Sequence, residues 1–332
     1  MNHFYNLADL SVEAVEALLD DAAKFKKRPL GTDLDGLQFA LLFLAPSLRT
    51  RCSFEVGIRQ LGGGVSTLEP SMFYGIETRD GVRMDGDSAE HIKEAVPVLS
   101  GFYSGLGLRV MAAGKSADED LGDRMFEAFR RDAKVPVFNM ESALYHPCQA
   151  LADMLTIREL LGSHKGRRLT LTWAPHPRPL PTAVPNSLLL AAAQLGMDVT
   201  VTHPEGFDLP ESITTKAAEL SQAAGGRIRT SHDQKSAFKN AEIVYAKSWG
   251  ALSRYDSADR EQELRQSHSK WTVDGALMND SANAYFMHCL PVRRNVVVTD
   301  EVIDHPRSAV LGQAENRLHA QKAVLKSLYA GQ

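Results

Sequence analysis

Residues 38–61, with the sequence QFALLFLAPSLRTRCSFEVGIRQL, contain the pattern that decides the fold. The stretch at 38–44, which is apolar at every position after Gln38, is typical of a strand that is buried on both faces. The following stretch, 50–61, predicts a helix, and the three glycines at 62–64 end it. A strand that leads directly into a helix is half of a βαβ unit, so this segment indicates a parallel α/β sheet.

The same alternation of strands and helices continues in both directions. Upstream, Ser11 can cap a first helix whose apolar face comprises Val15, Leu18, Leu19, Ala22 and Phe25. Downstream, a helix is expected between a cap at Ser88 and residue 99. The other expected strands are 65–68, 106–111, 135–140, 168–173, 198–202, 242–247 and 284–289, and the other expected helices are 118–131, 146–161, 187–195, 211–224 and 314–329. Two such runs, connected by the helix at 146–161, predict an α/β fold with two doubly wound parallel-sheet domains.

Composition excludes several classes of protein. The chain has 332 residues, of which 44% are hydrophobic and 23% charged, as in soluble proteins of two domains. Its net charge is −4 and no segment concentrates Lys and Arg, so no nucleic-acid partner is expected. The apolar runs are too short to cross a membrane, and no signal peptide is visible. Three cysteines without a CxxC pair argue against disulfides or zinc and favour the cytoplasm, and no metal, nucleotide or cofactor motif is present.

Two polar segments follow predicted strands at the start of helices, where ligands gather in open α/β sheets. Ser47, Leu48, Arg49 and Thr50 combine two hydroxyls, an arginine and free backbone N–H groups, which suits a phosphate. Simple capping by Ser47 is the alternative. The second segment is His146-Pro147-Cys148-Gln149. There, His146 could donate a hydrogen bond to a carbonyl oxygen, and Gln149 could hold an amide or amino group. A histidine that only occupies a helix start is the alternative there.

Two further segments contain prolines that stop a predicted strand. After the strand at 284–289, a proline turn would expose the backbone carbonyls of Cys289 and Leu290. We interpret the Cys289 thiol as packing, because no base is evident beside it. Residues 173–181, WAPHPRPLP, must form a stiff loop, and its polar groups are His176 and Arg178. A rigid linker without a ligand is the alternative for that loop.

The motifs SLRT (47–50), HPCQALAD (146–153) and HCLPVRRN (288–295) together resemble the aspartate/ornithine carbamoyltransferases, in matching order across nearly the whole chain. WAPHPRPLPTAVPNS (173–187) and VYAKSWGA (244–251) resemble the N-acylornithine branch of that family, and Lys247 lies where ordinary ornithine enzymes carry a Ser-Met-Gly loop. The resemblance implies a carbamoyl-phosphate domain at 1–145, completed by the C-terminal helix at 314–332, and an acylornithine domain at 146–313. It also implies a homotrimer with shared active sites, and a knotted region around the proline-rich loop of the second domain.

The resemblance further implies roles for individual residues. Arg109, His146 and Thr50 would be catalytic, acting on the carbonyl oxygen of carbamoyl phosphate. The residues that would bind this substrate are Ser47, Leu48, Arg49, Thr50, Tyr74, Arg109, His146, Gln149, Cys289, Leu290 and Arg317, with Tyr74 reaching a neighbouring subunit at a position where relatives have tryptophan. Those that would bind the acylornithine are Glu141, His176, Arg178, Lys247, Arg293 and Ala89. No metal or cofactor is implied.

The implied reaction transfers the carbamoyl group of carbamoyl phosphate to the δ-amine of N2-succinyl-L-ornithine, in arginine biosynthesis. The resemblance implies that Ala89 favours the succinyl group. In the acetyl-specific enzymes of the N-acylornithine branch, the residue that matches Ala89 is a glutamate. A glutamate there would repel the extra carboxylate of a succinyl group. N2-acetyl-L-ornithine as substrate, an ordinary ornithine carbamoyltransferase and a non-catalytic paralogue are the alternatives.

Overall fold

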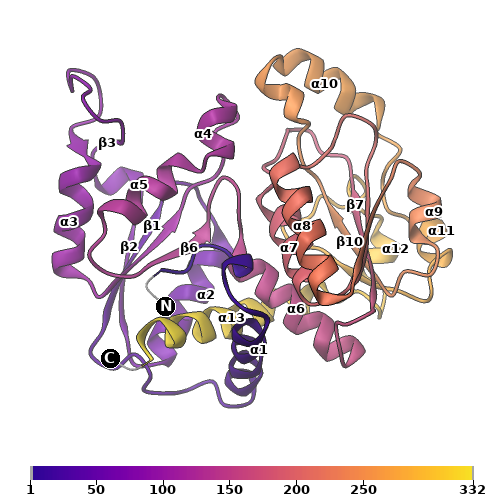
Figure 1. Ribbon diagram of the computed structural model, residues 1–332, viewed down its shortest axis with the longest axis horizontal. Coiled ribbons are helices and arrows are strands. Elements are labelled where there is room, and N and C mark those ends of the chain that lie inside the picture. The colour runs from indigo at the N-terminus through magenta and orange to yellow at the C-terminus, as the bar shows by residue number, and fades with distance from the viewer. Residues whose placement is uncertain (1–2, 331–332) are drawn as a thin grey trace.

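Two parallel β-sheets form the two halves of the molecule in the computed structural model, which describes residues 3–330 (Figure 1). The first sheet has the order β2-β1-β5-β6, formed by Gly64–Leu68, Gln38–Phe43, Gly105–Arg109 and Val137–Glu141. The second has the order β11-β10-β7-β8-β9, formed by Tyr285–Met287, Ile243–Lys247, Arg168–Trp173, Asp198–Thr202 and Arg227–Ser231. All neighbouring strands in both sheets are parallel, so the predicted α/β fold with two doubly wound sheets is confirmed.

Each sheet reverses its strand order at one point. In the first sheet the reversal lies between β1 and β5, where Phe43 pairs with Arg109. In the second it lies between β7 and β10, where Trp173 pairs with Lys247. At such a point the connections leave in opposite directions, and a crevice opens at the carboxyl ends of the two strands. The topology therefore places ligand sites at these two strand ends.

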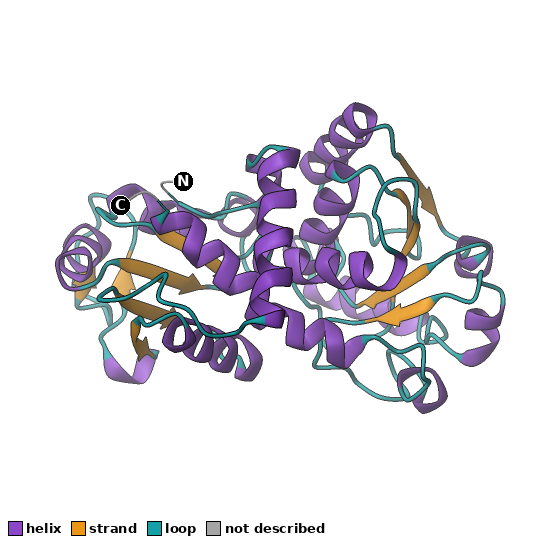
Figure 2. Cartoon of the chain, turned by 90° about the horizontal axis from the view of Figure 1, so that it is seen from below, coloured by secondary structure: helices purple, strands orange, loops and turns teal. Residues whose placement is uncertain are grey.

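Helices cover both sheets and fill the space between them (Figure 2). The first half contains α1 (Val12–Lys27), α2 (Leu48–Gln60), α3 (Ile92–Phe102), α4 (Ala117–Leu121) and α5 (Arg124–Asp132). The second contains α7 (Ala183–Gln194), α8 (Glu211–Ala224), α9 (Gln234–Phe238), α10 (Ala258–Ser267), α11 (Gly275–Asn279) and α12 (Asp300–Ile303). The connecting helix α6 (Pro147–Leu161) packs on the last helix, α13 (Val310–Tyr329), which also packs on α1 and α2.

The helix α6 is central to the molecule. Its first eleven residues, 147–157, are all buried, because one side packs on α13 and another on α7. A helix that is apolar on nearly all sides is expected in such an interior position. Gly162 then ends it with a φ of 78°, in the left-handed region that glycine adopts without strain. The prediction of a helix connecting the two runs at 146–161 is confirmed.

Local sequence signals explain several helix boundaries. The Ser11 hydroxyl accepts a hydrogen bond from the Ala14 N–H, and the five apolar residues predicted for the inner face of α1 are all buried. The predicted cap at Ser88 is wrong: α3 is capped by His91, whose Nδ1 accepts from the Lys93 N–H. Pairing of β4 (Glu90–His91) with β3 (Ile76–Glu77) keeps the chain extended up to His91, which delays the helix.

The helix predicted at 118–131 is instead two helices, α4 and α5. Asp123 interrupts them with a φ of 47°. Its buried carboxylate accepts hydrogen bonds from the Tyr5 hydroxyl and the Ala143 N–H, and these contacts hold the backbone out of the helical conformation. Sequence reasoning also missed the strand β9 and the helix α10, which lie mostly at the surface of the second half.

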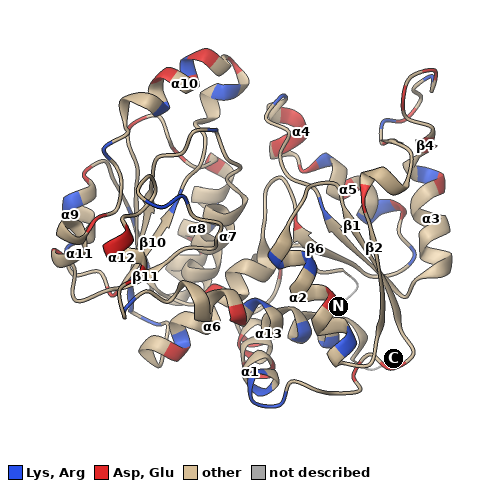
Figure 3. Cartoon of the chain, turned by 180° about the vertical axis from the view of Figure 1, so that it is seen from behind, with Lys and Arg blue, Asp and Glu red and all other residues tan. Residues whose placement is uncertain are grey.

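Charged residues of both signs are interleaved along the chain (Figure 3). Few of them lie on the strands, whose side chains are mostly apolar. Across residues 3–330, no helix is both long and apolar enough to cross a lipid bilayer.

Candidate active site

A cavity of about 270 Å³ lies where the carboxyl ends of the two sheets face each other. The last residues of β5, β6 and β10 and the segments that follow β1, β5, β6, β7 and β11 contribute to its wall. It brings together twelve of the predicted site residues: Ser47, Arg49, Thr50, Arg109, Glu141, His146, Gln149, His176, Lys247, Cys289, Leu290 and Arg317. Four of these are Arg or Lys and only Glu141 is acidic, so the cavity suits a ligand with several negative charges.

The N-terminus of α2 forms one wall of this cavity. The Ser47 hydroxyl accepts from the Thr50 N–H at 3.2 Å, so this residue is the cap of the helix. Thr50 Oγ1 accepts from Ser47 at 3.0 Å and from Arg317 Nη2 at 2.6 Å, which leaves its own hydroxyl proton for a ligand. Arg49 is half-buried, and within the described chain its Nε has no hydrogen-bond partner. Capping and an anion site therefore coexist at this helix end.

Arg109, Glu141 and His146 form a buried cluster behind that wall. Arg109 donates from Nη1 to the Glu141 carboxylate and from Nε to the Ala45 carbonyl at 3.2 Å. Burial by itself raises the pKa of Glu141, but the charge and the hydrogen bond of Arg109, together with the other positive charges nearby, outweigh burial, and the pKa falls to about 2. Burial also lowers the pKa of His146 to about 3. At neutral pH the cluster therefore contains a carboxylate, a guanidinium and a neutral imidazole, whose Nε2 lies 3.4 Å from Glu141 Oε2.

Cys289, Leu290 and Gln149 form another part of the wall. Leu290 has a φ of 53°, an uncommon value for a leucine, and its N–H donates to His288 Nδ1 at 2.9 Å. This conformation keeps the segment turned at the cavity. Gln149 donates from Nε2 to Asp153 at 2.7 Å, so its carbonyl oxygen faces away from that carboxylate.

The loop at 174–182 is held to the segment that follows β10. The Ser248 hydroxyl donates to the Pro175 carbonyl at 3.1 Å, and the Gly250 N–H donates to the Leu180 carbonyl at 2.9 Å. His176 Nε2 accepts from Arg293 Nε at 3.0 Å, and its Nδ1 lies 2.8 Å from the Arg178 carbonyl oxygen and 3.1 Å from the Arg178 amide nitrogen. The rigid loop thus places His176 in the cavity wall, and His176 in turn holds Arg293 at the edge of the cavity.

Five predicted site residues do not line the cavity. Arg293 reaches its edge only through His176, and the side chains of Leu48 and Arg178 are exposed. Tyr74, with 69% of its surface exposed, and Ala89 lie on the segment around β3 and β4, which projects from the first half away from the second (Figure 1). These two residues contribute nothing to the cavity of their own chain.

Sequence reasoning missed the apolar part of the wall. It consists of Pro46, Met111, Leu180, Pro181, Val184 and Pro291. Four of them lie inside the motifs at 173–187 and 288–295, and Pro46 and Met111 lie within two residues of Ser47 and Arg109. This position in the sequence is the only signal that could have identified them. Apolar side chains carry no chemical signature that separates a cavity wall from an ordinary core.

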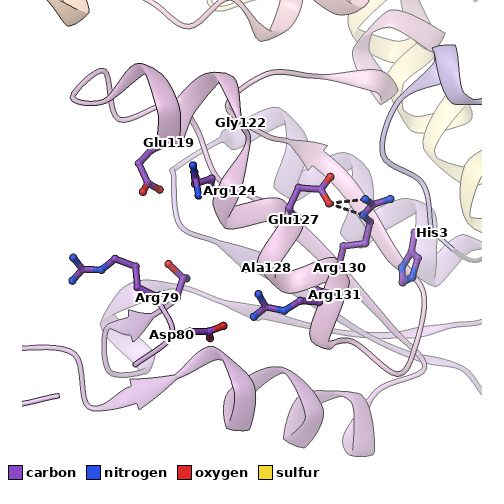
Figure 4. A pocket seen from close by; sticks show the side chains of 11 residues that line it. His3, Arg79, Asp80, Glu119, Gly122, Arg124, Glu127, Ala128, Arg130 and Arg131 are labelled. Carbon is purple, nitrogen blue, oxygen red and sulfur yellow. Dashed lines mark hydrogen bonds and ion pairs between the residues drawn. The ribbon is translucent and has the colours of Figure 1, made fainter. Parts of the chain in front are cut away.

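A larger cavity, of about 790 Å³, lies elsewhere in the first half (Figure 4). Its four arginines are already paired: Arg79 with Glu77, Arg124 with Asp118, Arg130 with Glu127 and Arg131 with Asp132. Its wall includes no residue from the motifs at the strand ends. We therefore place the candidate active site in the smaller cavity between the sheets.

Family models match the two halves of the chain separately. The carbamoyl-P binding domain of aspartate/ornithine carbamoyltransferase matches residues 2–159, and the Asp/Orn binding domain matches residues 181–328. The chain belongs to the aspartate/ornithine carbamoyltransferase family. The resemblance of its motifs to this family, and to the N-acylornithine carbamoyltransferases within it, is confirmed.

The alignments with individual relatives extend over almost the whole of this chain. It is 42% identical to the N-acetylornithine carbamoyltransferase of Xanthomonas campestris pv. campestris, over 99% of this chain and 98% of the relative. It is 36% identical to the N-succinylornithine carbamoyltransferase of Bacteroides thetaiotaomicron, over 98% and 97%. A solved structure of N-acetyl-L-ornithine transcarbamylase, in which one glutamate is replaced by alanine, is complexed with carbamyl phosphate and N-succinyl-L-norvaline. It superimposes with a TM-score of 0.97 at 42% identity, over 99% of this chain and 100% of that one.

Cys289 provides a first test of the site. Its thiol is buried, and burial raises the pKa of this thiol, so it is protonated at neutral pH. We expect Cys289→Ala to retain most of the carbamoyltransferase activity, because the backbone carbonyl remains, and to cost about 1 kcal/mol of stability. Steady-state kinetics and the unfolding temperature of the variant check this expectation. Complete inactivation of a folded variant would instead identify the thiol as a nucleophile.

Proposed function

We propose that this carbamoyltransferase acts on N2-succinyl-L-ornithine, giving N-succinyl-L-citrulline and phosphate in arginine biosynthesis. The charges in the wall of the cavity support the binding of carbamoyl phosphate. Arg49, Arg109, Lys247 and Arg317 line it together with the N-terminus of α2, against the single carboxylate of Glu141. This arrangement favours a phosphate and a developing oxyanion.

In the proposed reaction, the uncharged δ-amine attacks the carbonyl carbon of carbamoyl phosphate. The phosphate is bound by Ser47, Arg49 and Arg317, and by the free N–H groups at the start of α2 that include that of Leu48. The carbonyl oxygen, which becomes negative in the tetrahedral intermediate, accepts from Arg109, His146 and the Thr50 hydroxyl. Gln149 and the carbonyls of Cys289 and Leu290 accept from the carbamoyl amino group. The C–O bond to phosphate then breaks, the attacking nitrogen loses a proton to the departing phosphate, and Arg49 and Arg317 stabilise the charge that leaves.

The second substrate is proposed to lie against the proline-rich loop, and Tyr74 and Ala89 to serve a neighbouring subunit of a cytoplasmic homotrimer. Glu141, His176, Lys247 and Arg293 would hold its polar groups, with Arg178 as a further cation. Exposure of Tyr74 and Ala89 on a projecting segment supports their action outside their own chain.

The packing of α13 on α1 and α2 supports a first domain that comprises 1–145 and 314–332, and a second domain at 146–313. Residues 331–332 of the first domain lie outside those described. The knot around the loop stays a prediction.

The choice of the succinyl group rests on Ala89. A small uncharged residue leaves space for the extra carboxylate and does not repel it. The complex of a glutamate-to-alanine variant of a relative with N-succinyl-L-norvaline supports this reasoning. N2-acetyl-L-ornithine is the second candidate, and the higher identity to the N-acetylornithine enzyme favours it.

The test compares kcat/KM for N2-succinylornithine, N2-acetylornithine, ornithine and aspartate in the wild type, Ala89→Glu and Ala89→Gln. We expect the wild type to prefer N2-succinylornithine, and Ala89→Glu to lose at least about 10-fold for this substrate relative to N2-acetylornithine, because two carboxylates would meet. Ala89→Gln, of similar size but uncharged, should lose less.

A wild-type preference for N2-acetylornithine would overturn the succinyl assignment. Equal losses in the Glu and Gln variants would assign the effect to size rather than charge. A folded wild type that is inactive with all four substrates would identify a non-catalytic paralogue.

A further inference from the structure

Asp153 is a buried carboxylate that lies outside the wall of the active-site cavity. It follows Gln149 by four residues on α6, so the two side chains share one face of the helix. Its side chain is fully buried, and Oδ1 accepts two hydrogen bonds, from Gln149 Nε2 and Gln313 Nε2, both at 2.7 Å. Both of these donors are the amide groups of glutamines that lie on different helices.

The first of these hydrogen bonds determines which end of the Gln149 amide is directed to Asp153 and which end is left for another partner. A glutamine amide has an acceptor end and a donor end of similar shape, so packing alone does not choose between them. Asp153 Oδ1 accepts from two amide groups and therefore selects the Nε2 end of Gln149, whether or not Oδ2 carries a proton. Gln149 Oε1 is left buried, with no hydrogen-bond partner in residues 3–330, on a residue that lines the cavity.

The second hydrogen bond fixes a backbone segment on the other side of the cavity. Gln313 lies in α13, which packs on α6 between the two sheets (Figure 2). With its Nε2 on Asp153, its Oε1 accepts from the His288 N–H at 3.0 Å. The His288 ring in turn accepts from the Leu290 N–H at 2.9 Å. One carboxylate thus orients both a side-chain acceptor and the segment that carries the carbonyls of Cys289 and Leu290.

We propose that Asp153 is a positioning residue which, through Gln149 and Gln313, makes the site present only hydrogen-bond acceptors to the amino group of carbamoyl phosphate. This inference rests on the proposed roles of Gln149, Cys289 and Leu290. The NH₂ group of the substrate has donors alone, and a reversed Gln149 amide would set one NH₂ group against another. Asp153 therefore contributes to the choice of a carbamoyl group over an acetyl group, whose methyl forms no such hydrogen bonds.

The environment of Asp153 supports a role beyond packing. Burial raises its pKa to about 7, although the hydrogen bonds from the two glutamines and the charge of Arg317 oppose this shift. The Tyr245 hydroxyl is buried beside it. A carboxylate in such a place is costly, and an apolar side chain would pack there with less penalty if packing were its only purpose.

The first experiment measures the binding of two phosphates to wild type and Asp153→Ala, by competition at equilibrium. Carbamoyl phosphate should bind about 10- to 100-fold more weakly to the variant, because Gln149 loses its fixed orientation. Acetyl phosphate, which has a methyl in place of the amino group, should change by less than about twofold. An equal loss for both ligands would mean a general structural defect and would overturn the proposal.

The second experiment is a double-mutant cycle with Gln149→Ala. If Asp153 acts through Gln149, the double variant should bind carbamoyl phosphate about as weakly as Gln149→Ala alone. Multiplicative losses would overturn the proposal while leaving the role of Gln149 intact. Unchanged binding in Gln149→Ala itself would instead refute the proposed role of Gln149, and the inference with it.

Conservative variants complete the test. Asp153→Asn keeps an acceptor oxygen for the two amides and should recover most of the binding lost in Asp153→Ala, whereas failure to recover it would count against the proposal. If Asp153→Ala does not fold, Asp153→Ser keeps a polar group at the buried position, on a side chain too short to hold Gln149. The same comparison of carbamoyl and acetyl phosphate then applies to that variant.

Discussion

Arg49→Ala should lower kcat/KM for carbamoyl phosphate by about 10²- to 10³-fold, with little change in the unfolding temperature. Arg49 lies in the first turn of α2, lines the cavity and has an unpaired Nε in the described structure. A guanidinium stays charged at any working pH and can bind a phosphate through two parallel hydrogen bonds. Alanine is a good helix former, and the cap at Ser47 does not depend on residue 49, so α2 should persist.

Arg51 provides the matched control for this variant. It lies one half-turn further along α2, where it pairs with Glu55 at 3.1 Å and does not line the cavity. Arg51→Ala should therefore keep its kcat/KM, which shows that loss of any positive charge from this helix is not sufficient. A folded Arg49→Ala enzyme with near-normal turnover would refute the phosphate site at the N-terminus of α2.

Arg109→Met is expected to affect both stability and activity. The substitution leaves the Glu141 carboxylate buried without its main partner, which costs about 3–5 kcal/mol of stability. It also removes a proposed donor to the carbonyl oxygen, so activity should fall by about 10²-fold or more. Unfolding temperature and steady-state kinetics measure the two effects separately.

The double variant Arg109→Met/Glu141→Gln separates the two roles. Removing the unpaired charge should restore most of the unfolding temperature, while the carbamoyltransferase activity stays low. Recovery of activity together with stability would mean that Arg109 acts only in the fold. No destabilisation in Arg109→Met alone would mean that the ion pair contributes little to stability.

The elements that the sequence predicted best are those with a strong local pattern. The strand β8 and the helix α8 begin and end at the predicted residues, and α1 buries the predicted face. The strand β9 was missed because its sequence, RIRTS, is polar and the strand lies at the edge of its sheet. The helix α10, with the sequence ADREQELRQS, was missed because it lies at the surface and its sequence has no apolar stripe.

The type of most elements and the motifs at the strand ends could be predicted from local sequence, because periodicity and capping act within a few residues. The strand order, and with it the set of strand ends that meet around one cavity, became known from the folded chain. The tertiary structure also shows that Arg109 pairs with Glu141, that the side chains of Leu48 and Arg178 point outward, and that Asp153 meets Gln313 from 160 residues away. Such contacts follow from the packing of the whole chain, since no local pattern specifies which distant segments bury their apolar faces together.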